Sequence, residues 1–252
     1  MNSPNNQYTN TPITQKSVIL FDLDGTLIDS TEAILDSFRK SFAELGGSYP
    51  GDAAVKALVG HPLTEMYRSY GVPEERVAAY VDCYKRHYRQ VHTRKTVLLP
   101  GAREAVELAA SFARLGVVTT KTGKYSRELL EHFGLMERFE VLIGSEDVTR
   151  HKPHPEPLQV ALKRMETGPE RAWMIGDTCL DMEAARAAGV RPAGVCCGYG
   201  SEAALRQCGG WIFPDTLSAV KKIRTALQNP GEAPQRKALL SSEDYNSFNF
   251  QK

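Results

Sequence analysis

The sequence has little imbalance of charge, few cysteines and no long hydrophobic run. Its 252 residues carry a net charge of +1, so nothing favours nucleic acid or an acidic membrane surface as a partner. No run is long enough to span a membrane, and residues 1–16 lack the pattern of a signal peptide. The five cysteines include no CxxC pair, which argues against a zinc site and against a disulfide framework. A reducing cytoplasm fits this composition best.

The sequence does contain a regular alternation of hydrophobic strands and amphipathic helices. This alternation predicts an α/β fold with a parallel sheet and right-handed crossovers. After the first strand, residues 48–98 show apolar side chains at three- and four-residue spacing and no strand-like run, which predicts an inserted helical module. The predicted strands are residues 18–21, 115–120, 141–144, 173–176 and 193–197.

These patterns also divide the chain into segments. Residues 1–16 are polar and are expected to form a flexible lead, and the polar residues 229–252 are expected to form a frayed tail. Residues 17–28 together with 99–228 would form the α/β core. Residues 29–98 would form a helical cap over it.

Two aspartates follow the first strand directly. Asp22 and Asp24 would lie at the carboxyl end of a strand, where open α/β sheets bind ligands. Two crowded carboxylates repel each other unless a cation or a shared proton relieves them. Oxygen ligands in a small phosphate-handling site favour Mg²⁺. The alternative is a solvated turn with Asp and Gly as turn residues, and this stretch alone does not decide between the two.

Other polar residues fall at equivalent positions along the chain. Thr119 and Thr120 end the second strand, Lys152 follows the third, and Asp177 follows the fourth, with Asp181 four residues later. Taken singly, these residues have ordinary explanations as a strand-end hydroxyl, a solvated lysine or a helix cap. Because the carboxyl ends of parallel strands share one edge, we expect all of them in one site.

This set of residues suits phosphoryl transfer, in which a protein mainly positions groups and neutralises charge. Asp22 and Asp177 would hold Mg²⁺, and Asp22 would attack phosphorus in line. Asp24 would protonate the leaving oxygen and then deprotonate the attacking water. Thr119 and free backbone N–H groups would hold phosphate oxygens, and Lys152 would add a positive charge.

The motifs resemble those of the haloacid dehalogenase superfamily of phosphatases, over about residues 17–228. The run Asp22-Leu23-Asp24-Gly25-Thr26 matches its first motif, Thr119 its second, Lys152 its third, and Gly176-Asp177-Thr178 with Asp181 its fourth. The resemblance implies a Rossmann-like core, an aspartyl-phosphate intermediate and a helical cap. It also implies that the backbone carbonyl of Asp24 is a metal ligand, and it leaves open whether Asp181 binds the metal directly or through water. We assign Gly25 and Thr120 to substrate binding in the same motifs.

Within that superfamily, residues 197–202 and Asp29-Ser30 are most similar to the phosphoglycolate phosphatase and pyrophosphatase branch. This resemblance implies hydrolysis of a small phosphorylated metabolite such as phosphoglycolate, by a monomer or a homodimer. The alternatives are a pyrophosphatase, a phosphomutase of the β-phosphoglucomutase type and, from another class, a receiver-like signalling module phosphorylated on aspartate. In the cap, His61 and Arg89 are candidate substrate contacts, although a solvated face explains the basic residues 85–95 more simply.

Overall fold

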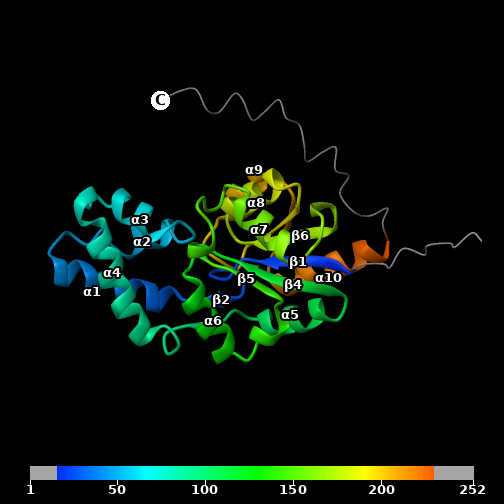
Figure 1. Ribbon diagram of the computed structural model, residues 1–252, viewed down its shortest axis with the longest axis horizontal. Coiled ribbons are helices and arrows are strands. Elements are labelled where there is room, and N and C mark those ends of the chain that lie inside the picture. The colour runs from blue at the N-terminus through cyan, green and yellow to red at the C-terminus, as the bar shows by residue number, and fades with distance from the viewer. Residues whose placement is uncertain (1–15, 230–252) are drawn as a thin grey trace, which may run out of the picture.

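The computed structural model describes residues 16–229, and its centre is a six-stranded parallel sheet (Figure 1). The strand order is β5-β4-β1-β6-β7-β8. The five predicted strands are confirmed, although β4 and β7 begin and end two residues earlier than predicted. The short β8 was missed. The strands are β1 (Ser17–Phe21), β4 (Ala113–Val118), β5 (Val141–Ile143), β6 (Ala172–Gly176), β7 (Arg191–Val195) and β8 (Trp211–Phe213).

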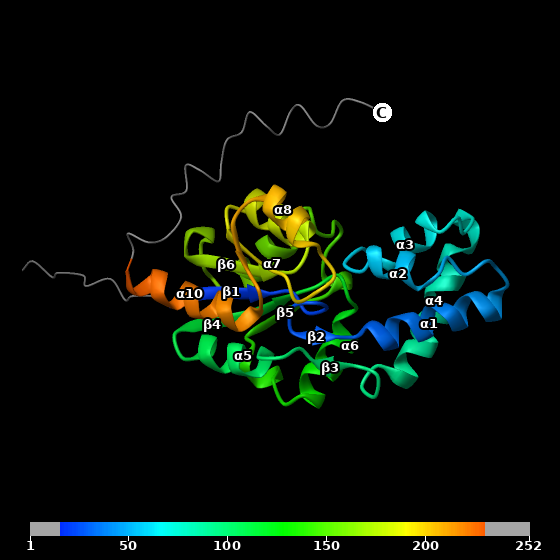
Figure 2. The same ribbon diagram turned by 180° about the vertical axis from the view of Figure 1, so that it is seen from behind.

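Both faces of this sheet are covered by helices (Figures 1 and 2). In β1, Ile19 and Phe21 belong to one hydrophobic cluster and Val18 and Leu20 to another, and all four are fully buried. Such burial on both faces is typical of parallel sheets. The first cluster includes residues of α5 (Ala102–Ala110), α6 (Gly123–His132) and α10 (Thr216–Gln228), and the second includes residues of α7 (Glu156–Arg164) and α8 (Cys179–Ala187), with α9 (Glu202–Cys208) packed beside α8. Short 3-10 turns are η1 (Met136–Arg138), η2 (Ser145–Asp147) and η3 (Pro169–Arg171).

Four helices between the first strand and the rest of the sheet have a hydrophobic cluster of their own, which includes Phe38, Tyr67 and Tyr84. These helices lie beside the sheet rather than on either face of it (Figure 2), and we call them the cap. They are connected to the core by an antiparallel pair of short strands. The cap helices are α1 (Thr31–Leu45), α2 (Asp52–Ala57), α3 (Leu63–Ser69) and α4 (Glu74–Val91), and the connecting strands are β2 (Ile28–Asp29) and β3 (Val97–Leu98).

We propose that the domain boundaries lie in this β2–β3 connection, at residues 28/29 and 98/99. The expected lead and tail fall almost entirely outside the described residues. Among residues 16–229, none of the helices has the length and apolar character needed to cross a membrane.

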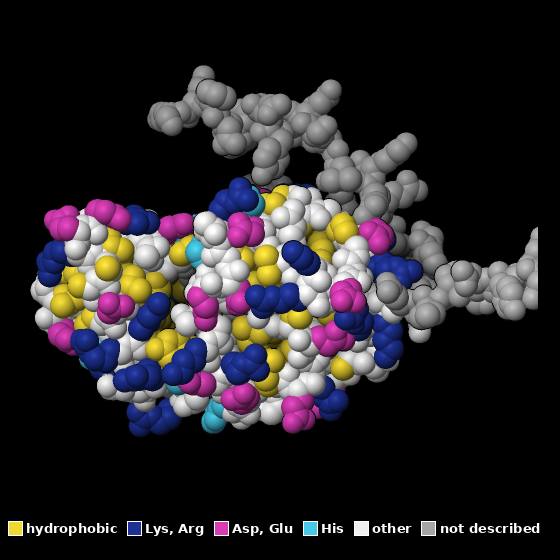
Figure 3. All heavy atoms as spheres, viewed as in Figure 1, with side chains coloured by type: hydrophobic (Ala, Val, Ile, Leu, Met, Phe, Trp, Pro, Cys, Tyr) yellow, Lys and Arg dark blue, Asp and Glu magenta, His cyan; other side chains and the backbone are white. Residues whose placement is uncertain are grey.

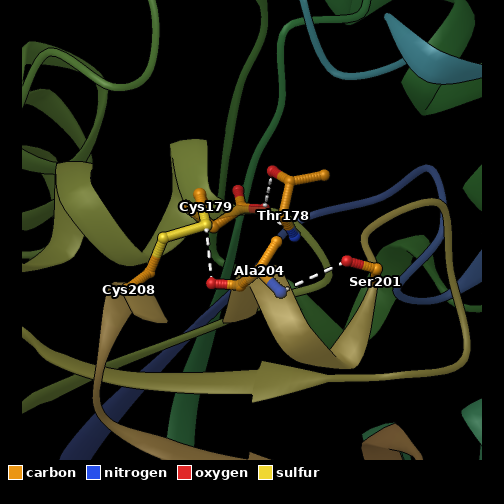
Figure 4. The surroundings of a disulfide bond; sticks show 6 residues. Thr178, Cys179, Ser201, Ala204 and Cys208 are labelled. Carbon is orange, nitrogen blue, oxygen red and sulfur yellow. Dashed lines mark hydrogen bonds between the residues drawn. A yellow bond between two sulfur atoms is a disulfide. The ribbon is translucent and has the colours of Figure 1, made fainter. Parts of the chain in front are cut away.

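The cysteines differ from expectation. Cys179, at the start of α8, forms a disulfide with Cys208, at the end of α9 (Figure 4). The sequence suggested no disulfide framework, and it gave no indication of this single bond. The two cysteines are 29 residues apart and are not part of a recognisable sequence motif. Only the packing of α8 against α9 brings them together. Cys196 and Cys197 are half-buried free cysteines, and Cys197 packs against the first hydrophobic cluster. Cysteine content therefore no longer argues for a reducing compartment.

Candidate active site

The predicted site residues lie at the carboxyl ends of three adjacent strands. Asp22 follows the last residue of β1, Thr119 follows β4, and Asp177 follows β6. Because β4 and β6 flank β1 and all three run in parallel, their ends meet at one edge of the sheet. Tertiary structure thus brings together residues that are far apart in the sequence.

Three carboxylates form a buried cluster at this edge. Oxygens of Asp22, Asp177 and Asp181 all lie within 4.8 Å of one another, and we call these residues the carboxylate cluster. Their exposed fractions are 4%, 0% and 0%. Two glycines make room for them. A Cβ on Gly176 would lie 2.2 Å from Cγ of Asp181, and a Cβ on Gly25, whose φ is +82°, would lie 2.2 Å from Oδ2 of Asp177.

Lys152 supplies a positive charge to this cluster. Its Nζ donates to Asp22 Oδ1 at 2.8 Å, to Asp181 Oδ1 at 2.5 Å and to the carbonyl of Val118 at 3.2 Å. Burial lowers the pKa of Lys152, but the carboxylates of Asp181 and Asp22 outweigh that effect and raise it above its ordinary value. Lys152 therefore remains protonated and fixes the orientation of the Asp22 carboxylate.

One lysine does not balance three carboxylates. Burial raises the pKa of Asp22 to about 7, even though Lys152 opposes the shift. Burial, with the charges of Asp22 and Asp181, raises the pKa of Asp177 well above its ordinary value. If all three carboxylates were ionised, Lys152 would leave an excess of negative charge in a buried site, and the raised pKa values express the cost of that excess. A bound cation would remove this excess.

The donor set fits a hard divalent cation such as Mg²⁺, which prefers oxygen ligands. Two of the carboxylates are also held in place by other groups of the protein. Asp177 accepts hydrogen bonds from Thr26 Oγ1 at 3.2 Å and from the backbone N–H of Tyr199 at 2.7 Å. Oδ2 of Asp181 accepts from the N–H and the hydroxyl of Thr178, the residue before α8. The cluster is thus preorganised to hold an ion.

The carboxylate of Asp24 lies outside this cluster. It accepts a hydrogen bond from Ser30 Oγ, and its Oδ2 lies 3.0 Å from Nζ of Lys121. The side chain of Lys121 is only 9% exposed, and its Nζ lies 4.6 Å from the centre of the Tyr88 ring, a cation–π distance. Sequence reasoning missed Lys121. Its position three residues after the end of β4, next to the expected Thr120, could have indicated it.

Comparison with known proteins agrees with this arrangement. The model of a family described as haloacid dehalogenase-like hydrolase matches residues 19–195 of the 252. The chain belongs to the haloacid dehalogenase-like hydrolases. The matched region contains the carboxylate cluster, Asp24, Thr119 and Lys152.

Several relatives match most of this haloacid dehalogenase-like chain. A protein from Dickeya dadantii named "Probable phosphatase IndB" is 30% identical over 225 residues, which is 87% of this chain and 98% of the relative. The pyrophosphatase PpaX of Halalkalibacterium halodurans is 35% identical over 181 residues, covering 70% and 82% of the two chains. A phosphoglycolate phosphatase from Nitrosococcus oceani is 29% identical over 217 residues, covering 83% and 96%.

A solved structure supports the same assignment. The crystal structure of a predicted phosphatase from Clostridium acetobutylicum superimposes with a TM-score of 0.77 at 26% identity, covering 84% of this chain and all of that one. Together with the curated relatives, this likeness identifies the haloacid dehalogenase-like chain as a phosphatase. The resemblance inferred from the motifs is thereby confirmed.

The other residues predicted to contact the substrate in this haloacid dehalogenase-like chain differ in how close the structure places them to the site. Thr119 is 4% exposed, and its Oγ1 accepts from the N–H of Lys121 at 3.2 Å. The hydroxyl of Thr120 donates to the carbonyl of Gly60 at 2.8 Å and so links the core to a cap loop. His61 lines the cavity between cap and core. Arg89 is exposed on α4 and is not a lining residue, so the structure does not bring it to the site.

That cavity begins at Asp24 and extends between the cap and the core. Its volume is about 330 Å³, within the range of small-molecule sites. Cap residues line one side, and Thr120, Lys121 and Tyr125 line the other. In the space-filling view a hollow between the two parts of the molecule is bordered by hydrophobic side chains (Figure 3). A substrate phosphate at the sheet edge would therefore leave the rest of the substrate in this cavity.

Proposed function

We propose that this phosphatase hydrolyses a small phosphate monoester through an aspartyl-phosphate on Asp22, with Mg²⁺ as its cofactor. The observation that carries the proposal is the position of Asp22. Its carboxylate is oriented by Lys152, belongs to the carboxylate cluster, and lies two residues from a second acid, Asp24, that lines the cavity. A nucleophile and a separate acid–base group are what a two-step hydrolysis needs.

In the first step, an oxygen of Asp22 attacks phosphorus, and an O–P bond forms as the ester P–O bond breaks. Asp24 donates a proton to the leaving oxygen and so releases an alcohol. In the second step Asp24 takes a proton from water, which attacks the same phosphorus, and the bond to Asp22 breaks to release inorganic phosphate. Lys121 and Ser30 hold the carboxylate of Asp24 throughout.

Mg²⁺, when bound by Asp22, Asp177 and the backbone carbonyl of Asp24, would supply positive charge to the phosphate oxygens. Asp181 would complete the site directly or through water. Thr119, Lys152 and the backbone N–H of Thr120 would bind the phosphate. The backbone N–H of Gly25 donates to the carbonyl of Ile28 at 2.8 Å, so the predicted contact of Gly25 with the substrate would not come from that group. These roles rest on the burial and contacts described above and on the family's motifs.

The substrate is a small phosphorylated metabolite. Phosphoglycolate is our first candidate from the sequence, and a relative bearing that name supports it. Pyrophosphate, an anhydride whose leaving group is phosphate rather than an alcohol, is the alternative substrate, supported by the PpaX relative. A cytoplasmic location remains part of the proposal, and the disulfide between Cys179 and Cys208 is the observation against it.

The test is phosphate release from a panel of phosphoglycolate, pyrophosphate, sugar phosphates and a nucleotide, with Mg²⁺ or with EDTA. We expect release only with Mg²⁺, and we expect Asp22→Asn to abolish it, because the amide is a far weaker nucleophile than the carboxylate. Asp82→Asn is the matched control, since Asp82 is exposed on α4 away from the cavity. Activity that survives in Asp22→Asn would refute the mechanism. Phosphorylated Asp22 without phosphate release would indicate a phosphomutase or a receiver-like signalling module instead.

A further inference from the structure

The cavity beside Asp24 is walled mainly by hydrophobic side chains. Phe38 from α1, Met66 from α3, and Val81 and Tyr84 from α4 line it on the cap side. Tyr125 of α6 lines it on the core side. All four of the cap residues are buried in the folded protein. The wall therefore consists of aromatic and aliphatic surface contributed by both parts of the chain.

Few basic side chains line this wall, and two of them already face acidic partners, while Asp24 and Glu146 are acidic lining residues. Nζ of Lys121 lies 3.0 Å from Oδ2 of Asp24, and Nδ1 of His61 lies 3.5 Å from Oε2 of Glu65. Lys85, half-exposed on α4, is the other lysine of the wall. No arginine occurs among the described residues that line the cavity.

This composition bears on the part of the substrate that is not phosphate. The carboxylate of phosphoglycolate or the second phosphate of pyrophosphate would lose water on entering, and this loss is unfavourable unless the protein supplies a cation or hydrogen bonds. Beyond Lys85, the described lining residues offer neutral hydroxyls, such as those of Thr64, Tyr88 and Thr122. The other lysine, Lys121, already faces Asp24. An apolar group would gain free energy by leaving water, and an aromatic ring would also gain from contact with Tyr84, Tyr125 and Phe38.

We infer that the substrate of this phosphatase carries an apolar group, of about the size of an aromatic ring, on its phosphate ester oxygen rather than a second anion. The inference rests on the proposed function, because it assumes that phosphate binds at the carboxylate cluster and that the leaving group lies in the cavity. The cap wall is then the determinant of substrate specificity, and it favours such an ester over phosphoglycolate and pyrophosphate, the candidates taken from the sequence and the relatives.

The test compares three esters of primary alcohols: 2-phenylethyl phosphate, ethyl phosphate and phosphoglycolate. Their leaving groups are all primary alkoxides, so differences in rate report mainly on the contacts of the remaining group. We expect kcat/KM for 2-phenylethyl phosphate to exceed both other values at least tenfold. Equal values for the phenylethyl and ethyl esters would overturn the inference. So would phosphoglycolate as the best substrate, with a selective loss of its hydrolysis in Lys85→Ala.

A matched pair of variants tests whether the preference for 2-phenylethyl phosphate arises in the cavity. Leu63 lines the cavity and is half-buried, whereas Leu58 is half-buried against the same cap cluster but is not a lining residue. We expect Leu63→Arg to lower kcat/KM for 2-phenylethyl phosphate at least fivefold and to raise it for phosphoglycolate. We expect Leu58→Arg to change neither by more than twofold. Thermal melting verifies that both variants fold, and equal effects of the two would contradict the assignment.

The outcomes separate this inference from the function on which it rests. Mg²⁺-dependent hydrolysis of all three esters at similar rates would overturn the inference and leave the phosphatase mechanism intact. If no ester, including the activated p-nitrophenyl phosphate, were hydrolysed, the proposed function would fail and the inference with it.

Discussion

The sheet edge and the cap wall are adjacent surfaces of opposite character, since the first is formed by buried charged groups and the second mainly by apolar side chains. At the sheet edge, Asp22, Asp181 and Lys152 are buried charges held at contacts of 2.5 to 2.8 Å. On the cap wall, Phe38 and Tyr84 pack with a ring-centre distance of 4.9 Å and contribute no charge. The difference indicates a division of labour. The charged edge acts on the phosphate common to every substrate, and the apolar wall acts on the group that distinguishes one substrate from another.

This division makes a general prediction. Changes at the sheet edge should lower the hydrolysis of all phosphate esters by the same factor, because each substrate presents the same phosphate. Changes in the cap should act on some substrates and not on others.

The largest effect is expected from Lys152→Met, which removes the cation between Asp22 and Asp181 at nearly constant side-chain length. Losing a charged contact at the reacting centre should lower kcat by about 10²- to 10³-fold. The factor should be the same for ethyl and 2-phenylethyl phosphate, as measured by steady-state phosphate release.

Lys163→Met is the control for this change, since Lys163 is exposed on α7. Its kcat should stay within twofold of the wild-type value. Thermal melting with Mg²⁺ distinguishes loss of catalysis from loss of fold in Lys152→Met, because breaking a buried ion pair is itself destabilising. A loss of activity that depended strongly on the alcohol group would refute the division of labour.

A smaller effect is expected from Glu128→Ala at the contact between cap and core. Glu128 Oε2, on α6, lies 2.9 Å from Nε2 of His92, which follows α4 and is only 5% exposed. A partly exposed pair of this kind contributes about 1 kcal/mol or less, so kcat/KM should fall by no more than about fivefold. The fall should be larger for 2-phenylethyl phosphate, whose ring reaches the cap, than for ethyl phosphate.

The neighbouring variant Arg89→Ala is a control for Glu128→Ala. Arg89 is exposed and does not line the cavity, so we expect no more than a twofold change for either ester. A larger loss would restore Arg89 as a substrate contact, as the sequence first suggested. It would also show that the cap acts through charge as well as through apolar contact.

The smallest expected change is in the number of free thiols and concerns the disulfide. This bond joins α8, the helix that carries Asp181, to α9 on the core side. Titration of unfolded, non-reduced protein should find three thiols per chain, those of Cys83, Cys196 and Cys197. After reduction it should find five. Cys208→Ser should show four thiols without reduction, because it frees Cys179. Five thiols in the untreated protein would contradict the disulfide.

Local patterns in the sequence are enough to predict most of the core. Asp22, Thr119 and Asp177 could be placed because each follows a recognisable strand, and parallel strands bring their carboxyl ends to one edge. The steric reason for Gly176 and Gly25 is visible only in the structure, where a side chain at either position would collide with the carboxylate cluster. The repeated strand–helix pattern is a local property of the sequence, so it can be recognised without the tertiary structure.

Tertiary structure decided the rest, because those features depend on contacts between segments with no shared local pattern. The three residues of β8 are too few to show a period, and the pairing of Cys179 with Cys208 depends on how α8 packs against α9. The same holds for Lys121, which is significant only because its Nζ reaches Asp24. The apolar cavity is formed jointly by cap and core side chains, and no single stretch of sequence contains that arrangement.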